Sequence, residues 1–199
     1  MAKAETDEIQ ADGRRARGHE NRRRIVEAML ALIGSGTISP RAEEVAARAE
    51  VGLRTVFRHF DDMDSLYREI SASMAKELLP ITAAPLPEGD WRVRLGELVE
   101  RRARGFEKMM PFKIAADVHR HRSEYLQVEH DELGRFQRDA LRTALGPRLC
   151  RNVIRLETLD LLMSFDAWRR MRLDQKLSVA QCKKLLTTAI AALLENDDE

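Results

Sequence analysis

Residues 41–60, RAEEVAARAEVGLRTVFRHF, decide the fold. The first half places small apolar residues on one narrow helical face, and the second half sets Val56 and Phe60 four positions apart on another. Cations such as Arg54 point away from that second face, and a tight turn at 49–52 joins the halves. This is the layout of a helix-turn-helix. Its second helix packs through apolar residues and leaves its cationic face free to enter a DNA major groove.

The charge of the chain is balanced as a whole but basic at one end. The 199 residues include 34 Lys and Arg against 33 Asp and Glu, so a net charge of +1 gives no whole-molecule reason to expect nucleic acid. From Gly13 to Phe60, however, there are ten arginines and five acids, a local balance of 10 − 5 = +5. We therefore expect DNA contacts from this end, with residues 14–24 as an arm that reaches phosphates or a minor groove.

The rest of the chain predicts an all-α protein, because apolar residues recur at spacings of three and four and alternating runs are almost absent. Ser39 is the expected N-cap of a helix that begins at Pro40, and Asp61 and Asp62 are the expected start of another. Further helices are predicted over about 20–33, 53–59, 91–110, 112–122, 124–145, 150–173 and 178–195, with the clearest break at 80–90.

No membrane or secretory segment is expected. The longest apolar run, Ala189 to Leu194, is too short to span a bilayer, and the polar N-terminus lacks the plan of a signal peptide. We therefore predict a cytoplasmic protein. Cys150 and Cys182 lie inside apolar helical patterns, which favours buried thiols over a disulfide framework or a zinc site.

Residues 21–70 resemble the N-terminal domain of TetR-family (tetracycline-repressor-like) transcriptional regulators, over about a quarter of the chain. The family pattern is an alanine-rich second helix, a turn ending in valine, then threonine, a branched residue, an aromatic, any residue, His or Tyr, and Phe. This chain has Val45-Ala46, Val51, Thr55, Val56, Phe57, Arg58, His59 and Phe60 at those places.

The resemblance implies a homodimeric, sequence-specific DNA-binding regulator, which we predict to be a repressor released by a small-molecule effector. It implies that Leu53, Arg54 and Phe57 face bases or the sugar edge. Thr55, Arg58 and His59 are implied to touch phosphates, as Arg41 would near the start of the preceding helix. The arginines of the arm, Arg14, Arg15 and Arg17, complete the predicted DNA-binding set.

Three residues depart from the family pattern. Glu50 replaces the turn glycine, which costs about 1 kcal/mol if the position is left-handed. Arg41 replaces the usual threonine near the start of the second helix, and its guanidinium could still contact a phosphate. Met63 replaces a common lysine, and Asp61 and Asp62 stand just before it. We expect weaker contact with the DNA backbone at that edge.

The predicted domains are a flexible basic arm at 1–18, a helix-turn-helix DNA-binding domain at 19–62, and a ligand-binding and dimerisation domain at 63–199. Helices 150–173 and 178–195 are apolar enough to meet their copies across a two-fold axis, although they could instead close the core of a monomer. The pocket candidates are adaptable or aromatic residues: Phe106, Met109, Met110, Phe112, Tyr125, Phe136, Phe165 and Trp168.

Other classes of function are weaker fits. Asp117, His121 and Glu124 share a helical face with tolerable metal-ligand geometry, but a solvated surface is the expected reading, and we predict no metal and no cofactor. The chain has no phosphate loop, nucleophile elbow or zinc signature, so we expect no enzyme. The alternative that stays open is a non-transcriptional DNA-binding or protein-docking module on the same fold.

Overall fold

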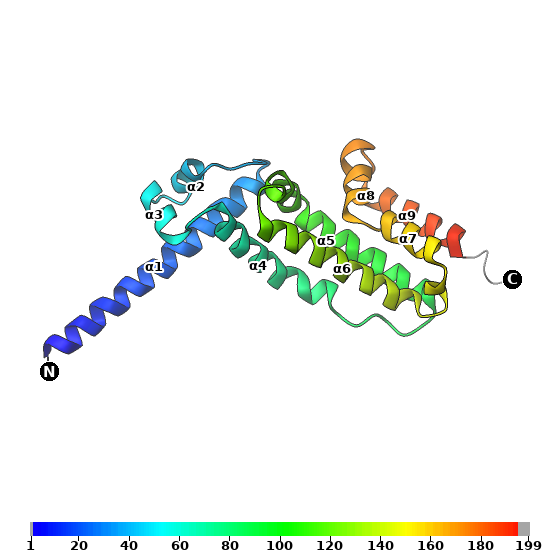
Figure 1. The fold of residues 1–199 in the computed structure, drawn as a ribbon, viewed down its shortest axis with the longest axis horizontal. Coiled ribbons are helices and arrows are strands. Elements are labelled where there is room, and N and C mark those ends of the chain that lie inside the picture. Colours follow the sequence, from blue (N-terminus) through cyan, green and yellow to red (C-terminus); the bar gives the residue numbers. More distant parts are fainter. Residues whose placement is uncertain (1, 195–199) are drawn as a thin grey trace. The chain divides into compact units, whose positions relative to one another are not determined.

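The computed structural model describes residues 2–194, with side chains from residue 16 onward, and every regular element in that range is helical (Figure 1). The all-α prediction is confirmed. No helix of this range is both long and apolar enough to cross a membrane. The elements are α1 Ala2–Gly34, α2 Ala42–Arg48, α3 Leu53–His59, α4 Met63–Thr82, α5 Trp91–Arg120, α6 Glu124–Leu145, a 3-10 turn Leu149–Arg151, α7 Val153–Leu162, α8 Phe165–Arg169, a π-helical turn Arg170–Asp174 and α9 Val179–Leu194.

The helices form two compact units. The first unit comprises residues 2–74 and 111–127, and the second comprises 75–110 and 128–194. α4, α5 and α6 therefore each contribute residues to both. The unit that contains α2 and α3 extends beyond residue 62, because the first part of α4 and the segment 111–127 share its apolar core.

The core of the first unit is built from one face of each short helix. α1 supplies the predicted stripe of Ile25, Ala28, Met29 and Ile33. The other buried members are Val45, Ala46, Ala49, Val56, Phe60, Leu66, Tyr67, Ile70, Ala115 and Leu126. The small alanines of α2 allow close approach to α1 and α3, as the sequence pattern predicts.

The first helix is longer than predicted. α1 begins at Ala2, so residues 2–18 are helical and do not form the expected flexible arm. Ala, Glu, Gln and Arg dominate that segment and favour helix through intrinsic propensity, and proline is absent from it. Its polarity, which suggested disorder, shows only that the segment has no apolar stripe to bury.

The start of α2 also differs from the prediction. Arg41, not Ser39, is the N-cap, and the Glu44 carboxylate accepts a hydrogen bond from the Arg41 backbone N–H at 2.8 Å. The Ser39 hydroxyl instead lies 3.1 Å from Nε2 of His119. At α4 the prediction is confirmed for Asp62, whose Oδ1 accepts from the Ser65 N–H at 2.8 Å.

Two predicted helices, 91–110 and 112–122, are one helix in the structure. α5 runs without interruption through Pro111. An interior proline removes a backbone hydrogen bond and costs about 3 kcal/mol. The residues on both sides are packed, with Met110 against the second core and Phe112 against the first, and this packing offsets the cost.

The single helix predicted over 150–173 is broken. α7 ends at Leu162, and Ser164 caps α8 by accepting from the Ala167 N–H at 3.2 Å. The carbonyl of Met163, at the break, accepts from the buried Arg102 guanidinium at 2.7 Å, and the same guanidinium also donates to the Gln137 carbonyl. A distant arginine therefore satisfies a polar group that a continuous helix would have paired internally.

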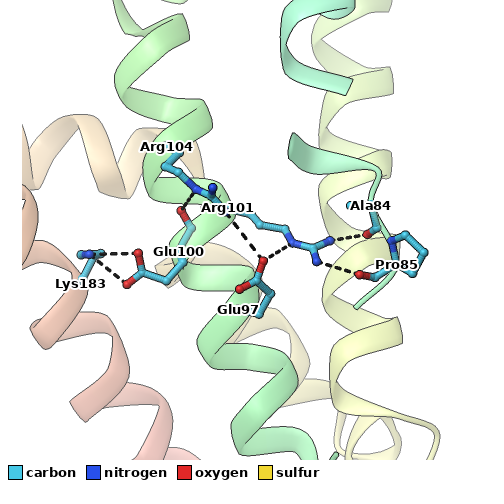
Figure 2. A network of polar contacts seen from close by, with 7 residues as sticks. All are labelled: Ala84, Pro85, Glu97, Glu100, Arg101, Arg104 and Lys183. Carbon is cyan, nitrogen blue, oxygen red and sulfur yellow. Dashed lines mark hydrogen bonds and ion pairs between the residues drawn. The ribbon is translucent and has the colours of Figure 1, made fainter. Parts of the chain in front are cut away.

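Polar contacts also fix the connection between α4 and α5 within the second unit (Figure 2). Arg101 is buried and donates to the carbonyls of Ala84 and Pro85, the latter at 2.7 Å, and to Glu97 at 2.6 Å. Glu100, the residue before Arg101, forms an ion pair with Lys183 of α9 at 2.9 Å. The hydrogen bonds from Arg101 to Ala84 and Pro85 thus fix the connection, although it has no helix of its own.

Candidate nucleic-acid interface

The turn between α2 and α3 is built around a left-handed residue. Glu50 has φ 53°, and the Val51 N–H donates back to the Ala46 carbonyl at 3.0 Å. Glu50 is therefore left-handed, which is the case in which a residue with a Cβ has a steric cost there. Its carboxylate lies 3.1 Å from Nη2 of Arg24 on α1. That exposed ion pair offsets only a small part of the cost.

α3 has one buried face and one exposed face. Val56 and the following Phe60 are buried in the core of the first unit. On the other side, Leu53 is 37% exposed and Phe57 50% exposed, and Arg54 and Arg58 are exposed as well. Two large apolar side chains and two arginines thus share the exposed face of α3. The arrangement suits contact with base edges and phosphates.

The arginines of the basic end fall into two groups. Several are occupied within the protein: Arg22 binds Glu69 at 2.7 Å, Arg23 binds Glu20 and Glu27, Arg24 binds Glu50, and Arg41 lies 3.7 Å from Glu44. Exposed arginines without an ion pair or side-chain hydrogen bond to any described residue are Arg17, Arg48, Arg54 and Arg58. The side chains of Arg14 and Arg15 lie outside the described residues.

His59 differs from the exposed arginines beside it. The side chain is half-buried, and Nε2 is buried without a hydrogen-bond partner among the described residues. Burial lowers the pKa of the imidazole, and the charges of Arg58 and Arg22 lower it further. The lowered pKa favours the neutral ring, and because Nε2 is buried, a contact of His59 with a phosphate would have to come from another part of the residue.

The end of α5 and the start of α6 contact α4 within the first unit, through residues that belong to neither the predicted DNA-binding set nor the predicted pocket set. The ring of His119 lies 5.4 Å from that of Tyr67, and the Ser123 hydroxyl donates to Asp64 at 2.9 Å. Burial raises the pKa of Tyr67 to about 12. The sequence signal for these contacts is only the density of polar residues at 117–132, for which a solvated surface was expected and a metal site was considered as the alternative.

That metal site is not formed. Asp117 pairs with Lys113 at 2.8 Å and lies 3.7 Å from Arg120, and His121 and Glu124 are exposed. Among the residues described, no group of three His, Cys, Asp or Glu side chains could hold a metal ion.

The eight predicted pocket residues do not come together. Phe106, Phe165 and Trp168 form one buried cluster in the second unit, with ring centroids 5.6 Å and 6.2 Å apart around Phe106, and Met109 and Met110 pack against the same core. Phe112 and Tyr125 pack against the core of the first unit, and Phe136 is exposed. Five of the eight thus share one core, and the other three lie elsewhere.

The predicted dimerisation helices keep apolar side chains exposed in the single chain. Ile154 and Leu161, seven positions apart on α7, are 81% and 69% exposed, and Leu185 on α9 is also exposed. The opposite faces of the same helices, with Leu156, Leu159 and Leu186, are buried in the second core. Of the two cysteines in this unit, Cys182 is buried and Cys150 half-buried, and both are free thiols.

Comparison with known proteins shows the fold. No protein-family model matches the chain, and no curated protein matches it. The chain is similar to the crystal structure of a protein from Streptomyces coelicolor A3(2) that is described as a proposed transcriptional regulator. The two are 21% identical, the similarity covers 87% of this chain and 98% of that one, and the TM-score is 0.58. The chain therefore shares its all-α fold, with a helix-turn-helix and a larger helical region, with that solved structure.

Proposed function

We propose that this protein is a sequence-specific DNA-binding transcriptional regulator. The observation that carries the proposal is the exposed face of α3, where Arg54, Phe57 and Arg58 lie opposite the buried Val56. The similar structure from Streptomyces coelicolor, itself described as a proposed regulator, supports the assignment, as does the resemblance of residues 21–70 to the TetR family.

In this proposal α3 enters the major groove. Arg54 and Phe57 contact base edges, because a guanidinium fork matches guanine and an aromatic ring can pack on a thymine methyl group. Thr55, Arg58 and His59 contact phosphates and set the position of the helix on the duplex. The free arginines Arg17 and Arg48 add charge without reading sequence.

The regulator acts as a homodimer. Ile154 and Leu161 of α7 and Leu185 of α9 are exposed apolar side chains on neighbouring helices, and a two-fold axis through them would bury each set against its copy. A two-fold dimer presents two copies of α3 and reads an inverted repeat.

We further propose that a small molecule releases the protein from its operator and that the protein is a repressor. The aromatic cluster of Phe106, Phe165 and Trp168 is the best supported part of the effector region, since Met109 and Met110 beside it can adapt to a ligand. A ligand acts only if it binds one arrangement of the dimer more tightly than the other, because equal affinity shifts no equilibrium.

The test is selection of bound duplexes from a random-sequence DNA library by the purified protein at one fixed, moderate salt concentration. Salt must be fixed because non-specific arginine contacts otherwise mask preference. An enriched inverted repeat supports a dimeric reader, and protection of a few promoters in the source genome supports a regulator. Binding to all sequences alike favours an architectural DNA-binding protein, and a folded dimer that retains no DNA favours a docking module.

A further inference from the structure

The turn between α6 and α7 contains a groove that the proposed function does not use. It is a largely open groove with a volume of about 500 Å³. None of its residues belongs to the predicted DNA-binding or pocket sets. The lining residues are Arg142, Thr143, Gly146, Pro147, Cys150 and Leu156.

The groove lies in a basic stretch of the chain. Residues 140–156 contain four arginines, at 142, 148, 151 and 155, and no acid. Arg142 lines the groove, is exposed, and has no side-chain hydrogen bond or ion pair to any described residue. Arg94 of α5 reaches the same place: its Nε donates to the Ala144 carbonyl at 2.8 Å and its Nη1 to the Gly89 carbonyl, which leaves Nη2, 3.7 Å from the position that a Cβ on Gly146 would take.

Acids flank this stretch on both sides and offset part of its charge. Asp139 is exposed one turn before Arg142. Glu157, just after the stretch, accepts two hydrogen bonds from Arg138, this pairing lowers the pKa of its carboxyl, and the charge of Arg142 contributes to the lowered pKa. Asp90 Oδ1 accepts hydrogen bonds from the backbone N–H groups of Arg92 and Val93 at the start of α5. The exposed Glu88 is left as the one acid of the neighbouring connection whose carboxylate has no bond to a described residue.

We propose that this groove binds a small, phosphate-bearing polyanion. Guanidinium groups match the geometry of phosphate oxygens and bind them through paired, charge-assisted hydrogen bonds. The Thr143 hydroxyl donates to the Asp139 carbonyl, so its oxygen remains able to accept from a ligand group. Leu156 and Pro147 give the groove an apolar part, which suits the non-phosphate portion of a nucleotide better than a bare inorganic ion.

The cysteines provide a direct readout. Cys150 lines the groove and is half-buried, whereas Cys182 is completely buried and serves as an internal reference. We would measure alkylation of each thiol by iodoacetamide with mass spectrometry, alone and with pyrophosphate, ADP or adenosine, and titrate the same probes calorimetrically. Pyrophosphate and ADP are expected to slow alkylation of Cys150 about fivefold or more near saturation, while adenosine has no effect.

Two arginine variants make the test specific. Arg142→Gln is expected to weaken the binding of ADP and pyrophosphate about tenfold, the size of one charge-assisted hydrogen bond. Arg170→Gln removes an exposed arginine of the same unit outside the groove and is expected to leave both affinities unchanged. Circular dichroism confirms that both variants are folded.

Each remaining outcome is decisive. Tighter binding of ADP than of pyrophosphate supports a nucleotide-like ligand, and equal binding supports an inorganic polyphosphate source. Absence of both heat and thiol protection at millimolar concentrations overturns the proposal. So does equal weakening by the two variants, which would indicate non-specific attraction. Failure here leaves DNA selection by the first unit unaffected, since no groove residue belongs to α3.

Discussion

The guanidinium of Arg22 lies 4.4 Å from the centroid of the Phe60 ring. It also donates to the His59 carbonyl at 2.6 Å and to Glu69 at 2.7 Å. One arginine of α1 thus stacks on the residue that follows α3, caps the last carbonyl of that helix and reaches α4. A cation at a helix C-terminus is also favoured by the helix dipole. Arg22 therefore positions α3. Because its guanidinium is bound to the His59 carbonyl and to Glu69, it is less free to bind a DNA phosphate than the exposed Arg54.

Replacing Arg22 should lower stability and DNA affinity together. We expect Arg22→Ala to lower the free energy of unfolding by about 1–2 kcal/mol, because it removes a cation–π contact and a hydrogen bond to a helix end. Urea denaturation followed by circular dichroism measures this loss. Arg23→Ala is the matched control, since Arg23 makes only exposed ion pairs within α1. If both variants lose the same stability, Arg22 has no special role in holding α3.

The left-handed turn residue gives a second prediction. Glu50→Gly and Glu50→Ala both remove the ion pair with Arg24, but only glycine relieves the strain at φ 53°. The glycine variant should therefore be more stable than the alanine variant by about 1 kcal/mol, as measured by urea denaturation. Both variants should also bind DNA more tightly than the parent at low salt, because a negative charge next to α3 is lost. Equal stabilities would show that the turn relaxes when the ion pair is removed.

His59 should make stability depend on pH. Its pKa is lowered in the folded protein, so below the unfolded value of about 6.5 the unfolded chain takes up a proton more readily than the folded one. Stability is then complete above that pH, falls as the pH drops toward the folded pKa, and levels off below it. Urea denaturation at pH 7.5 and pH 5.5 should show a smaller loss for His59→Gln than for the parent. The other histidines are present in both proteins, so an identical loss would mean that His59 titrates normally.

Structural features that arise from neighbouring residues could be predicted from the sequence, and features that depend on distant residues could not. α3 was predicted at its observed bounds, because Val56, Phe60 and the flanking turn residues all lie within a few positions. The break at Ser164 was missed because part of its cause is Arg102, which lies 61 positions from Met163. The same holds for Arg22, which is 37 positions from the carbonyl that it caps. Sequence spacing identified the basic end, but it could not separate the occupied arginines from the free ones.

Dimerisation should fail when a charge is placed on the exposed apolar face. Ile154→Glu and Leu161→Glu change side chains that are exposed in the single chain, so each variant should fold while the buried charge disfavours a dimer. Multi-angle light scattering should find a dimer for the parent and a monomer for the variants. Val93→Glu, on an exposed apolar residue of α5, is the control and should remain dimeric. Monomeric variants that still bind an inverted repeat with full affinity would contradict the dimer proposal.

Arg54 and Arg58 should have different effects on DNA binding although both are exposed on α3. Arg54→Ala removes the proposed base contact, so it should reduce discrimination at one position of the selected operator by about 1–3 kcal/mol. Arg58→Ala removes a proposed phosphate contact, so it should weaken binding to all sequences and make the slope of log K against log salt shallower by about one unit. Fluorescence anisotropy with the selected operator, single-base variants of it and a scrambled duplex, over a salt series, separates the two. Arg170→Ala, from the second unit, controls for loss of charge alone. If Arg54→Ala changes neither affinity nor preference, α3 is not the helix that reads the DNA.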